Sequence, residues 1–149
     1  MNEINSKNKN PKYNSSGYRD MTAFEAIGNA DRAKRQVAEF RKVYICSPLR
    51  GEVEKNTANA IRYCKFALKH KRFPIAPHIW FPRFLNDDIP AERELALKMG
   101  LWLLTQCGEV WVFGSRISEG MAAEIKAAKK QGKPIKYIKV EGGGTPYAD

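Results

Sequence analysis

Four short apolar runs alternate with helical patterns between residues 43 and 140, and this alternation restricts the fold more than any other feature. Strands separated by helices predict a parallel sheet with right-handed crossovers and helices on both faces. The predicted strands cover residues 43–46, 73–76, 109–113 and 134–140. The sequence therefore predicts an α/β fold, a doubly wound parallel sheet of the Rossmann or flavodoxin-like type, with four to five strands.

The chain is predicted to contain one α/β domain between short flanking segments. Its 149 residues fit a single domain. Residues 1–18, rich in Asn, Ser and Lys, are expected to form a flexible arm, and residues 19–42 a helical segment. The α/β domain spans residues 43–140, and the glycine-rich residues 141–149 are expected to form a flexible tail.

Helix signals mark the segments between the predicted strands. Asn56 or Thr57 is expected to cap the first helix, and Pro90 to open the second. The third is expected to run from Ser118 to Gln131 and to end at Gly132, because glycine readily adopts the left-handed conformation that terminates helices. The second helix is expected to bury three leucines, Leu97, Leu101 and Leu104.

Composition limits the classes of protein that need to be considered. Apolar residues make up 43% of the chain and charged residues 28%, which is typical of a globular protein. No apolar run is long enough for a membrane span, and the first residues lack the apolar core of a secretory signal. Cys46, Cys64 and Cys107 match neither a zinc site nor a disulfide framework. We expect a cytoplasmic protein without metal, cofactor or membrane partner.

A net charge of +10 raises the possibility of nucleic-acid binding. The basic residues are scattered along the sequence, however. Residues 1–42 carry nine Lys or Arg against five acids, and residues 43–149 carry seventeen against eleven. This scatter favours an ordinary basic surface over a nucleic-acid site, and a basic surface would also suit a phosphorylated small-molecule substrate.

Polar and aromatic side chains follow the first two predicted strands, where open α/β sheets bind ligands. Ser47, Arg50 and Gly51 can form an anion site, because Arg forks onto oxyanions and glycine permits close backbone approach. Each is equally compatible with an ordinary strand-to-helix loop. His78 and Trp80 can bond to or stack on a ligand, or serve the structure alone.

Glu124 lies in the second turn of the helix that follows the third predicted strand. Side chains on helices lean toward the helix N-terminus, so its carboxylate is expected to point at the ligand crevice and can act as a nucleophile. A solvated carboxylate beside Lys126–Lys130 is the alternative. Ser118 can serve both as helix N-cap and as a ligand hydroxyl.

Two segments resemble a known superfamily. Residues 43–51, Val-Tyr-Ile-Cys-Ser-Pro-Leu-Arg-Gly, are similar to the first strand and phosphate loop of the nucleoside 2-deoxyribosyltransferase-like superfamily, in particular its 2'-deoxynucleoside 5'-phosphate N-hydrolase branch. Residues 118–132 resemble the nucleophile helix of that family, with Gly120 and Gly132 flanking Glu124. Uncharacterised phage and mobile-element proteins of the superfamily look similar as well.

The resemblance implies an N-glycosidase or deoxyribosyltransferase. Glu124 would attack the anomeric carbon of a deoxyribose while the base leaves, as in a retaining glycosidase. The resemblance also implies a homo-oligomer and a nucleoside or nucleotide substrate. The 5'-phosphate would contact Ser47, Arg50, Gly51 and Ser118, Tyr44 would line the sugar site, and the motif around the nucleophile adds Gly120 and Met121.

The sequence departs from the family at the acid that protonates the leaving base. The helix before the third strand offers Leu97, Gly100, Leu101 and Leu104 where the family often has Asp. Asp87, Asp88, Glu92 and Glu94 lie upstream. Three hypotheses follow: a Glu-dependent N-glycosidase or transferase, a nucleotide sensor or sequestering protein that binds without cleavage, and a nucleic-acid-binding accessory protein.

Overall fold

The structure is a computed structural model that describes residues 21–147, with side chains described from residue 25. The chain divides into two compact units, the first ending at Glu39 and the second beginning at Phe40. The first unit contains helix α1 (Met21–Ala38), within the predicted helical segment. The predicted arm, residues 1–18, lies outside the described residues.

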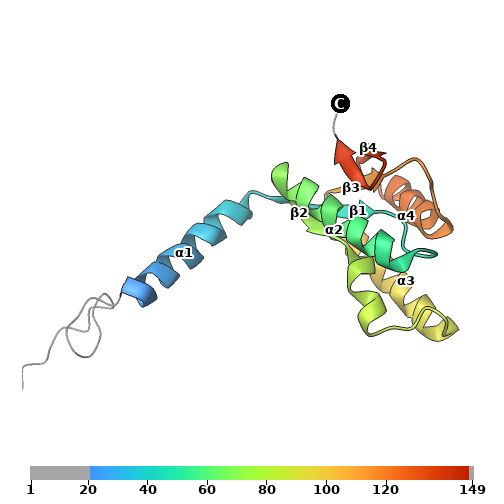
Figure 1. The fold of residues 1–149 in the computed structure, drawn as a ribbon, viewed down its shortest axis with the longest axis horizontal. Helices are drawn as coiled ribbons and strands as arrows, with labels where there is room; N and C mark the ends of the chain where they lie inside the picture. The colour runs from blue at the N-terminus through green and yellow to red at the C-terminus, as the bar shows by residue number, and fades with distance from the viewer. Residues whose placement is uncertain (1–20, 148–149) are drawn as a thin grey trace, which may run out of the picture. The chain divides into compact units, whose positions relative to one another are not determined.

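The second unit alternates strands and helices along the chain (Figure 1). Two short 3-10 helices, η1 and η2, occupy the loop after β2. In order, the elements are β1 (Arg41–Cys46), α2 (Val53–Lys69), β2 (Arg72–Ile75), η1 (Pro77–Ile79), η2 (Phe81–Arg83), α3 (Pro90–Thr105), β3 (Glu109–Phe113), α4 (Glu119–Lys130), β4 (Ile135–Glu141) and β5 (Thr145–Tyr147).

One five-stranded sheet forms the centre of this unit, in the order β2-β1-β3-β4-β5. The first four strands are parallel and β5 pairs antiparallel with β4. Because β1 lies between β2 and β3, the chain winds outward from β1 in both directions, which creates a topological switch point between β1 and β3. The predicted α/β fold class is confirmed.

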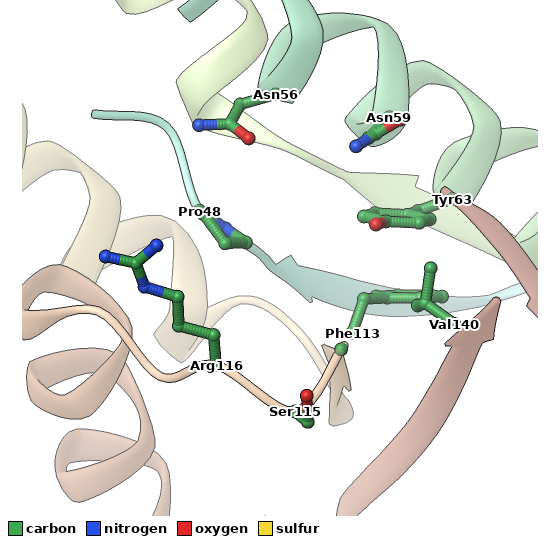
Figure 2. Close-up of a pocket in the computed structure, with 9 residues that line it drawn as sticks. Pro48, Asn56, Asn59, Tyr63, Phe113, Ser115, Arg116 and Val140 are labelled. Carbon is green, nitrogen blue, oxygen red and sulfur yellow. The ribbon is translucent and has the colours of Figure 1, made fainter. Parts of the chain in front are cut away.

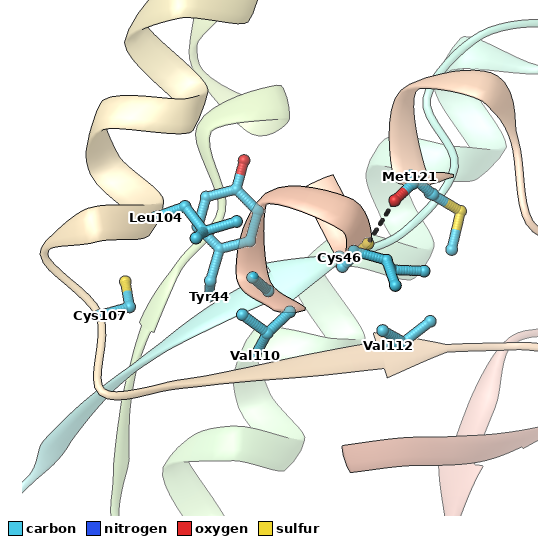
Figure 3. Packing of buried hydrophobic residues seen from close by; sticks show 9 residues of the cluster. Tyr44, Cys46, Leu104, Cys107, Val110, Val112 and Met121 are labelled. Carbon is cyan, nitrogen blue, oxygen red and sulfur yellow. Dashed lines mark hydrogen bonds between the residues drawn. The ribbon is translucent and has the colours of Figure 1, made fainter. Parts of the chain in front are cut away.

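The sheet carries a hydrophobic core on each face, because successive strand residues point to opposite sides. Tyr44 and Cys46 of β1 pack with α3 and α4 around Leu104 and Met121 (Figure 3). Val43 and Ile45, the alternate residues of the same strand, pack on the other face with α2. Helices therefore cover both faces, as predicted.

Three sequence predictions about local structure are wrong. Residues 145–147 form β5 rather than part of a flexible tail. Leu97 is 46% exposed, because α3 is apolar around most of its circumference and turns only Gly100 and Leu104 fully inward. Asn56 and Thr57, the two predicted caps, both lie inside α2, whose N-cap is Glu52 without a side-chain cap bond.

Candidate functional site

The carboxyl ends of β1 and β3 bring most of the predicted site residues to one edge of the sheet. The loop after β1 leads to α2 on one face, whereas the loop after β3 leads to α4 on the other. Diverging loops of this kind leave a crevice in which α/β proteins bind ligands. The predicted site residues at these strand ends form three separate contacts, and a pocket lies on the α2 side of the sheet.

Tyr44 and Glu124 form the first contact. The Tyr44 hydroxyl donates a hydrogen bond of 2.8 Å to Glu124 Oε1. Tyr44 is fully buried in β1 and Glu124 is half-buried on α4. The glycine at position 100 of α3 leaves room for this hydroxyl, since a Cβ there would lie 3.4 Å from it. A side chain of the core thus fixes one oxygen of the predicted nucleophile.

Burial dominates the protonation of this pair. It raises the pKa of the Glu124 carboxyl, although the hydrogen bonds from Tyr44 and Cys46 act to lower that pKa. The pKa of Tyr44 is raised well above its ordinary value by burial and then by the charge of Glu124. Tyr44 therefore stays protonated, and its hydroxyl donates a hydrogen bond to the Glu124 carboxyl group. Within residues 21–147, no cation pairs with Glu124.

Cys46 borders the same carboxyl from the end of β1. Its thiol points at the Met121 carbonyl oxygen, with Sγ 3.9 Å away (Figure 3). Burial, followed by the charge of Glu124, raises the pKa of Cys46, so the thiol remains neutral. Cys46 was not among the predicted site residues, but the two-residue period of a strand places it on the same face as Tyr44.

Ser47 and His78 form the second contact. Ser47 Oγ lies 2.8 Å from His78 Nε2, joining the loops that follow β1 and β2. Burial lowers the pKa of His78 to about 4, so the imidazole is neutral at pH 7. Ser47 is nearly buried, at 7% exposure. The neutral imidazole and the hydroxyl hold each other in place next to the crevice.

Arg50 forms the third contact with an acid from the long loop after β2. Arg50 Nε lies 2.8 Å from Asp87 Oδ2, and Arg93 approaches the other oxygen of Asp87 at 4.0 Å. Both partners of the closer pair are about half exposed. The Arg50 guanidinium, which we predicted to bind a phosphate, is therefore paired with Asp87. A phosphate that binds Arg50 would have to compete with this carboxylate.

The start of α4 places the remaining residues of the predicted motif. Ser118 is the N-cap, and its Oγ accepts a 3.3 Å hydrogen bond from Met121 N. Gly120 is exposed, with open space where a Cβ would stand. The Met121 side chain is buried in the core, so it is unavailable for ligand contact.

Gly51 lies in the loop between β1 and α2, and Trp80 lies between η1 and η2 in the loop that follows β2. Gly51 has a φ of 93°, a left-handed conformation that favours glycine where the chain turns toward α2. Trp80 is 67% exposed and covers no part of the core. Neither residue contacts Glu124 through a hydrogen bond.

A pocket on the α2 side of the strand ends was not predicted (Figure 2). Its volume is about 210 Å³. None of the predicted site residues lines it, because it lies against the opposite face of the sheet from Glu124. The sequence feature that could have indicated this pocket is the helical spacing of Asn56, Asn59 and Tyr63, which places polar and aromatic groups on one side of α2. The lining consists of Pro48, Asn56, Asn59, Tyr63, Phe113, Gly114, Ser115, Arg116 and Val140.

The described residues contain neither a metal-binding cluster nor a membrane-spanning helix. No group of three or more His, Cys, Asp or Glu side chains within residues 21–147 is arranged to hold a metal ion. Over the same range, none of the helices has the length and apolar character needed to cross a membrane.

Comparisons with known proteins support the fold. A family model described as a domain of unknown function, DUF7768, matches residues 41–138. A solved 2-deoxyribosyltransferase from the psychrotolerant bacterium Bacillus psychrosaccharolyticus, a biocatalyst for synthesis of antiviral and antitumoral nucleosides, is similar with a TM-score of 0.52. Sequence identity is 19%, over 68% of this chain and 74% of that one. Comparison with curated proteins gave no match. This chain and the 2-deoxyribosyltransferase are thus similar in fold.

Proposed function

The chain belongs to the DUF7768 family, and from its deoxyribosyltransferase-like fold we propose that it cleaves or transfers the N-glycosidic bond of a nucleoside or nucleotide. The observation that carries this proposal is the Tyr44–Glu124 hydrogen bond at the ligand edge of the sheet. A half-buried carboxylate oriented by a neutral donor suits a nucleophile. Among the residues whose side chains are described, no cation forms an ion pair with this carboxylate.

The proposed reaction proceeds in two steps. A Glu124 oxygen attacks the anomeric carbon of the sugar while the bond to the base breaks, giving a glycosyl-enzyme ester. Water, or the nitrogen of a second base, then attacks the same carbon and releases the carboxylate. The oxocarbenium-like transition state carries positive charge, and it would supply the counter-charge that Glu124 lacks in the free protein.

Asp87 is a candidate for the acid that protonates the leaving base, which the sequence lacks at the position where the family often has Asp. The leaving base needs a proton, and α3 presents no carboxylate on its buried side. The loop after β2 carries Asp87 to Arg50, beside the loop that follows β1. A phosphate bound by Arg50 would release Asp87 from its ion pair, and Asp87 is therefore our proposed acid.

The test is release of free base from a panel of nucleosides and deoxynucleotides, followed by chromatography. Glu124→Ala is expected to lower turnover by at least about a thousandfold, because no other group forms the covalent intermediate. Glu119→Ala is the matched control, since Glu119 is an exposed carboxylate on the same helix. Full turnover by Glu124→Ala would exclude this assignment.

A nucleotide sensor that binds without cleavage is the alternative, and the ion pair between Arg50 and Asp87 favours it. An Asp87 carboxylate held by Arg50 is not free to approach the leaving base. This alternative predicts a ligand-dependent rise in the melting temperature of the wild-type protein with no base released. Base release with the same ligands would exclude the sensor.

We also propose a cytoplasmic homo-oligomer. Cys46, Cys64 and Cys107 are free thiols, which fits a reducing compartment. Helix α3 exposes Leu97 and Trp102 to solvent, and a second copy of the chain would bury them. Light scattering coupled to size exclusion tests the assembly, and Trp102→Glu is expected to shift it toward the monomer.

A further inference from the structure

We propose that the pocket between α2 and the ends of β1, β3 and β4 binds a small phosphomonoester that carries hydroxyl groups. This binding site lies on the opposite face of the sheet from Glu124 and does not depend on the proposed nucleophile. Its volume of about 210 Å³ suits a small metabolite rather than a drug-sized molecule.

The position of the pocket is the first argument. Pro48 comes from the loop after β1, and Ser115 and Arg116 come from the loop after β3. These two loops flank the topological switch point, where they turn to opposite faces of the sheet. Gly114 has a φ of 87°, and this turn directs Ser115 and Arg116 over the opening. Switch points are the places where open α/β sheets bind ligands.

Charge supplies the second argument. Arg116 is the cation of the lining, and no carboxylate is among the residues that line the pocket. Within residues 21–147, no ion pair or hydrogen bond engages the Arg116 guanidinium. Figure 2 shows this side chain beside Pro48, extending toward the rim that includes Asn56. An unpaired guanidinium at a concave site attracts an oxyanion, which it can bind through two parallel N–H groups.

Uncharged polar side chains in the pocket can supply further hydrogen bonds to the ligand. Asn59 Oδ1 accepts a 2.9 Å hydrogen bond from Arg62 Nη1, which leaves the Asn59 amide nitrogen to donate to a ligand. Ser115 adds a hydroxyl donor. Asn56 Nδ2 donates to the carbonyl oxygens of Leu49 and Arg50, so its own Oδ1 can accept from a ligand hydroxyl. The pocket thus offers donors for an oxyanion and an acceptor for an alcohol.

The apolar wall is preformed. The rings of Tyr63 and Phe113 are stacked, with centroids 4.3 Å apart and planes at 7°. Val140 of β4 completes this wall. Because the stack belongs to the core on the α2 face, its side chains need little ordering when a ligand binds. A short carbon skeleton can pack here while its phosphate reaches Arg116.

The test titrates sn-glycerol 3-phosphate into the full-length protein and follows backbone amides by NMR. We expect shifts at residues 56–63 and 114–116. Arg116→Ala is expected to weaken binding at least about tenfold, because a charged hydrogen-bonding partner is lost. Arg83→Ala is the matched control, since Arg83 is exposed and lies outside the pocket. Inorganic phosphate and acetate are expected to bind more weakly than the phosphomonoester.

Several outcomes would overturn the proposal. They are no shifts at up to about 10 mM ligand, unchanged affinity in Arg116→Ala, shifts confined to residues 118–124, or acetate binding as tightly as the phosphomonoester. Glu124→Gln separates this site from the proposed reaction, because it should leave binding of glycerol 3-phosphate unchanged. Loss of base release in Glu124→Gln with retained binding would leave both proposals standing.

Discussion

Glu124 is a largely desolvated carboxyl group, and no Lys, Arg or His in the described part of the chain forms an ion pair with it. The Tyr44 hydroxyl donates a hydrogen bond to it and the neighbouring Cys46 thiol is neutral, and burial outweighs both in setting the pKa of Glu124 above its ordinary value. Burying a charge under such conditions costs stability unless it is fully paired. This residue is therefore expected to destabilise the free protein at neutral pH, as active-site groups often do.

The first prediction concerns the pH dependence of stability at this residue. Because the pKa of Glu124 is raised in the folded state, the folded protein holds its proton more tightly than the unfolded chain does. The contribution of Glu124 to the free energy of unfolding is therefore largest below the ordinary pKa and falls as pH rises toward the raised value. Glu124→Gln removes the ionisable group and therefore this contribution to the pH dependence of the free energy of unfolding. The stability of Glu124→Gln relative to wild type is expected to rise between pH 4 and pH 8, as measured by urea unfolding.

Glu119→Gln is the control for this experiment. Glu119 is exposed on the same helix, and its replacement should leave the pH profile close to that of the wild type. A relative stability of Glu124→Gln that is constant over the pH range would contradict the burial argument. A relative stability that falls with pH would indicate that Tyr44 and Cys46 outweigh burial.

Ser118, at the N-terminus of α4, caps the helix and is also predicted to bind the phosphate of a ligand. Ser118 Oγ accepts from Met121 N, so Ser118→Ala is expected to lower the free energy of unfolding by about 1 kcal/mol. Ser118→Asp keeps a cap acceptor and should retain nearly full stability, but its charge would repel a phosphate. Unfolding and ligand affinity are measured on both variants. Equal affinity of Ser118→Asp and wild type for a phosphorylated ligand would remove Ser118 from the binding site.

The elements with two clear end signals were predicted most accurately. Strand β3 lies exactly where its apolar run predicts, and α4 has the predicted Ser118 cap and the predicted stop at Gly132, whose φ is 66°. Strand β5 was missed because Thr145–Tyr147 is short and follows glycines, and Pro146 is acceptable only at the edge of a sheet. The orientation of Leu97 was missed because apolar residues lie around most of the circumference of α3, so its sequence does not select one buried face.

The sequence indicated which elements carry the candidate site residues, but it did not indicate which of these side chains contact one another. The helix position of Glu124 indicated that its side chain points toward the crevice, yet its partner Tyr44 is 80 positions away. The alternation along β1 groups Tyr44 with Cys46 but does not identify which face meets α4. The pairing of Arg50 with Asp87 depends on the path of the loop through η1 and η2, which has no periodicity. Long-range contacts of this kind require the assembled fold.

The β4–β5 hairpin attaches the end of the chain to α2 and shapes the pocket. Arg62 Nη1 donates to the carbonyl oxygen of Gly143 at 2.6 Å and also to Asn59 Oδ1. A Cβ at position 144 would lie 2.1 Å from Asn59 Oδ1. The Asn59 side chain would have to move to admit a side chain at position 144, and Asn59 is one of the residues that line the pocket.

A pair of glycine substitutions tests this packing. Gly144→Ala combines an unfavourable φ of +79° with the clash against Asn59, and should lower the free energy of unfolding by about 2–4 kcal/mol. Gly143→Ala has a similar φ of +88° but open space, so only the backbone cost of about 1–2 kcal/mol is expected. Urea unfolding of both variants measures the difference. Equal losses would mean that the hairpin does not pack closely on Asn59.

The two compact units predict how the molecule responds to shortening. Every residue of the two hydrophobic core clusters lies between Val43 and Ile138, within the second unit. A chain of residues 40–149 retains all five strands and helices α2–α4, so it is expected to fold with a free energy of unfolding within about 0.5 kcal/mol of the full chain. Chemical denaturation of both forms checks this. A large loss on removal of residues 1–39 would instead show that this segment stabilises the α/β unit, directly or through assembly. Repeating the measurement at several protein concentrations separates these two causes, because only assembly makes stability depend on concentration.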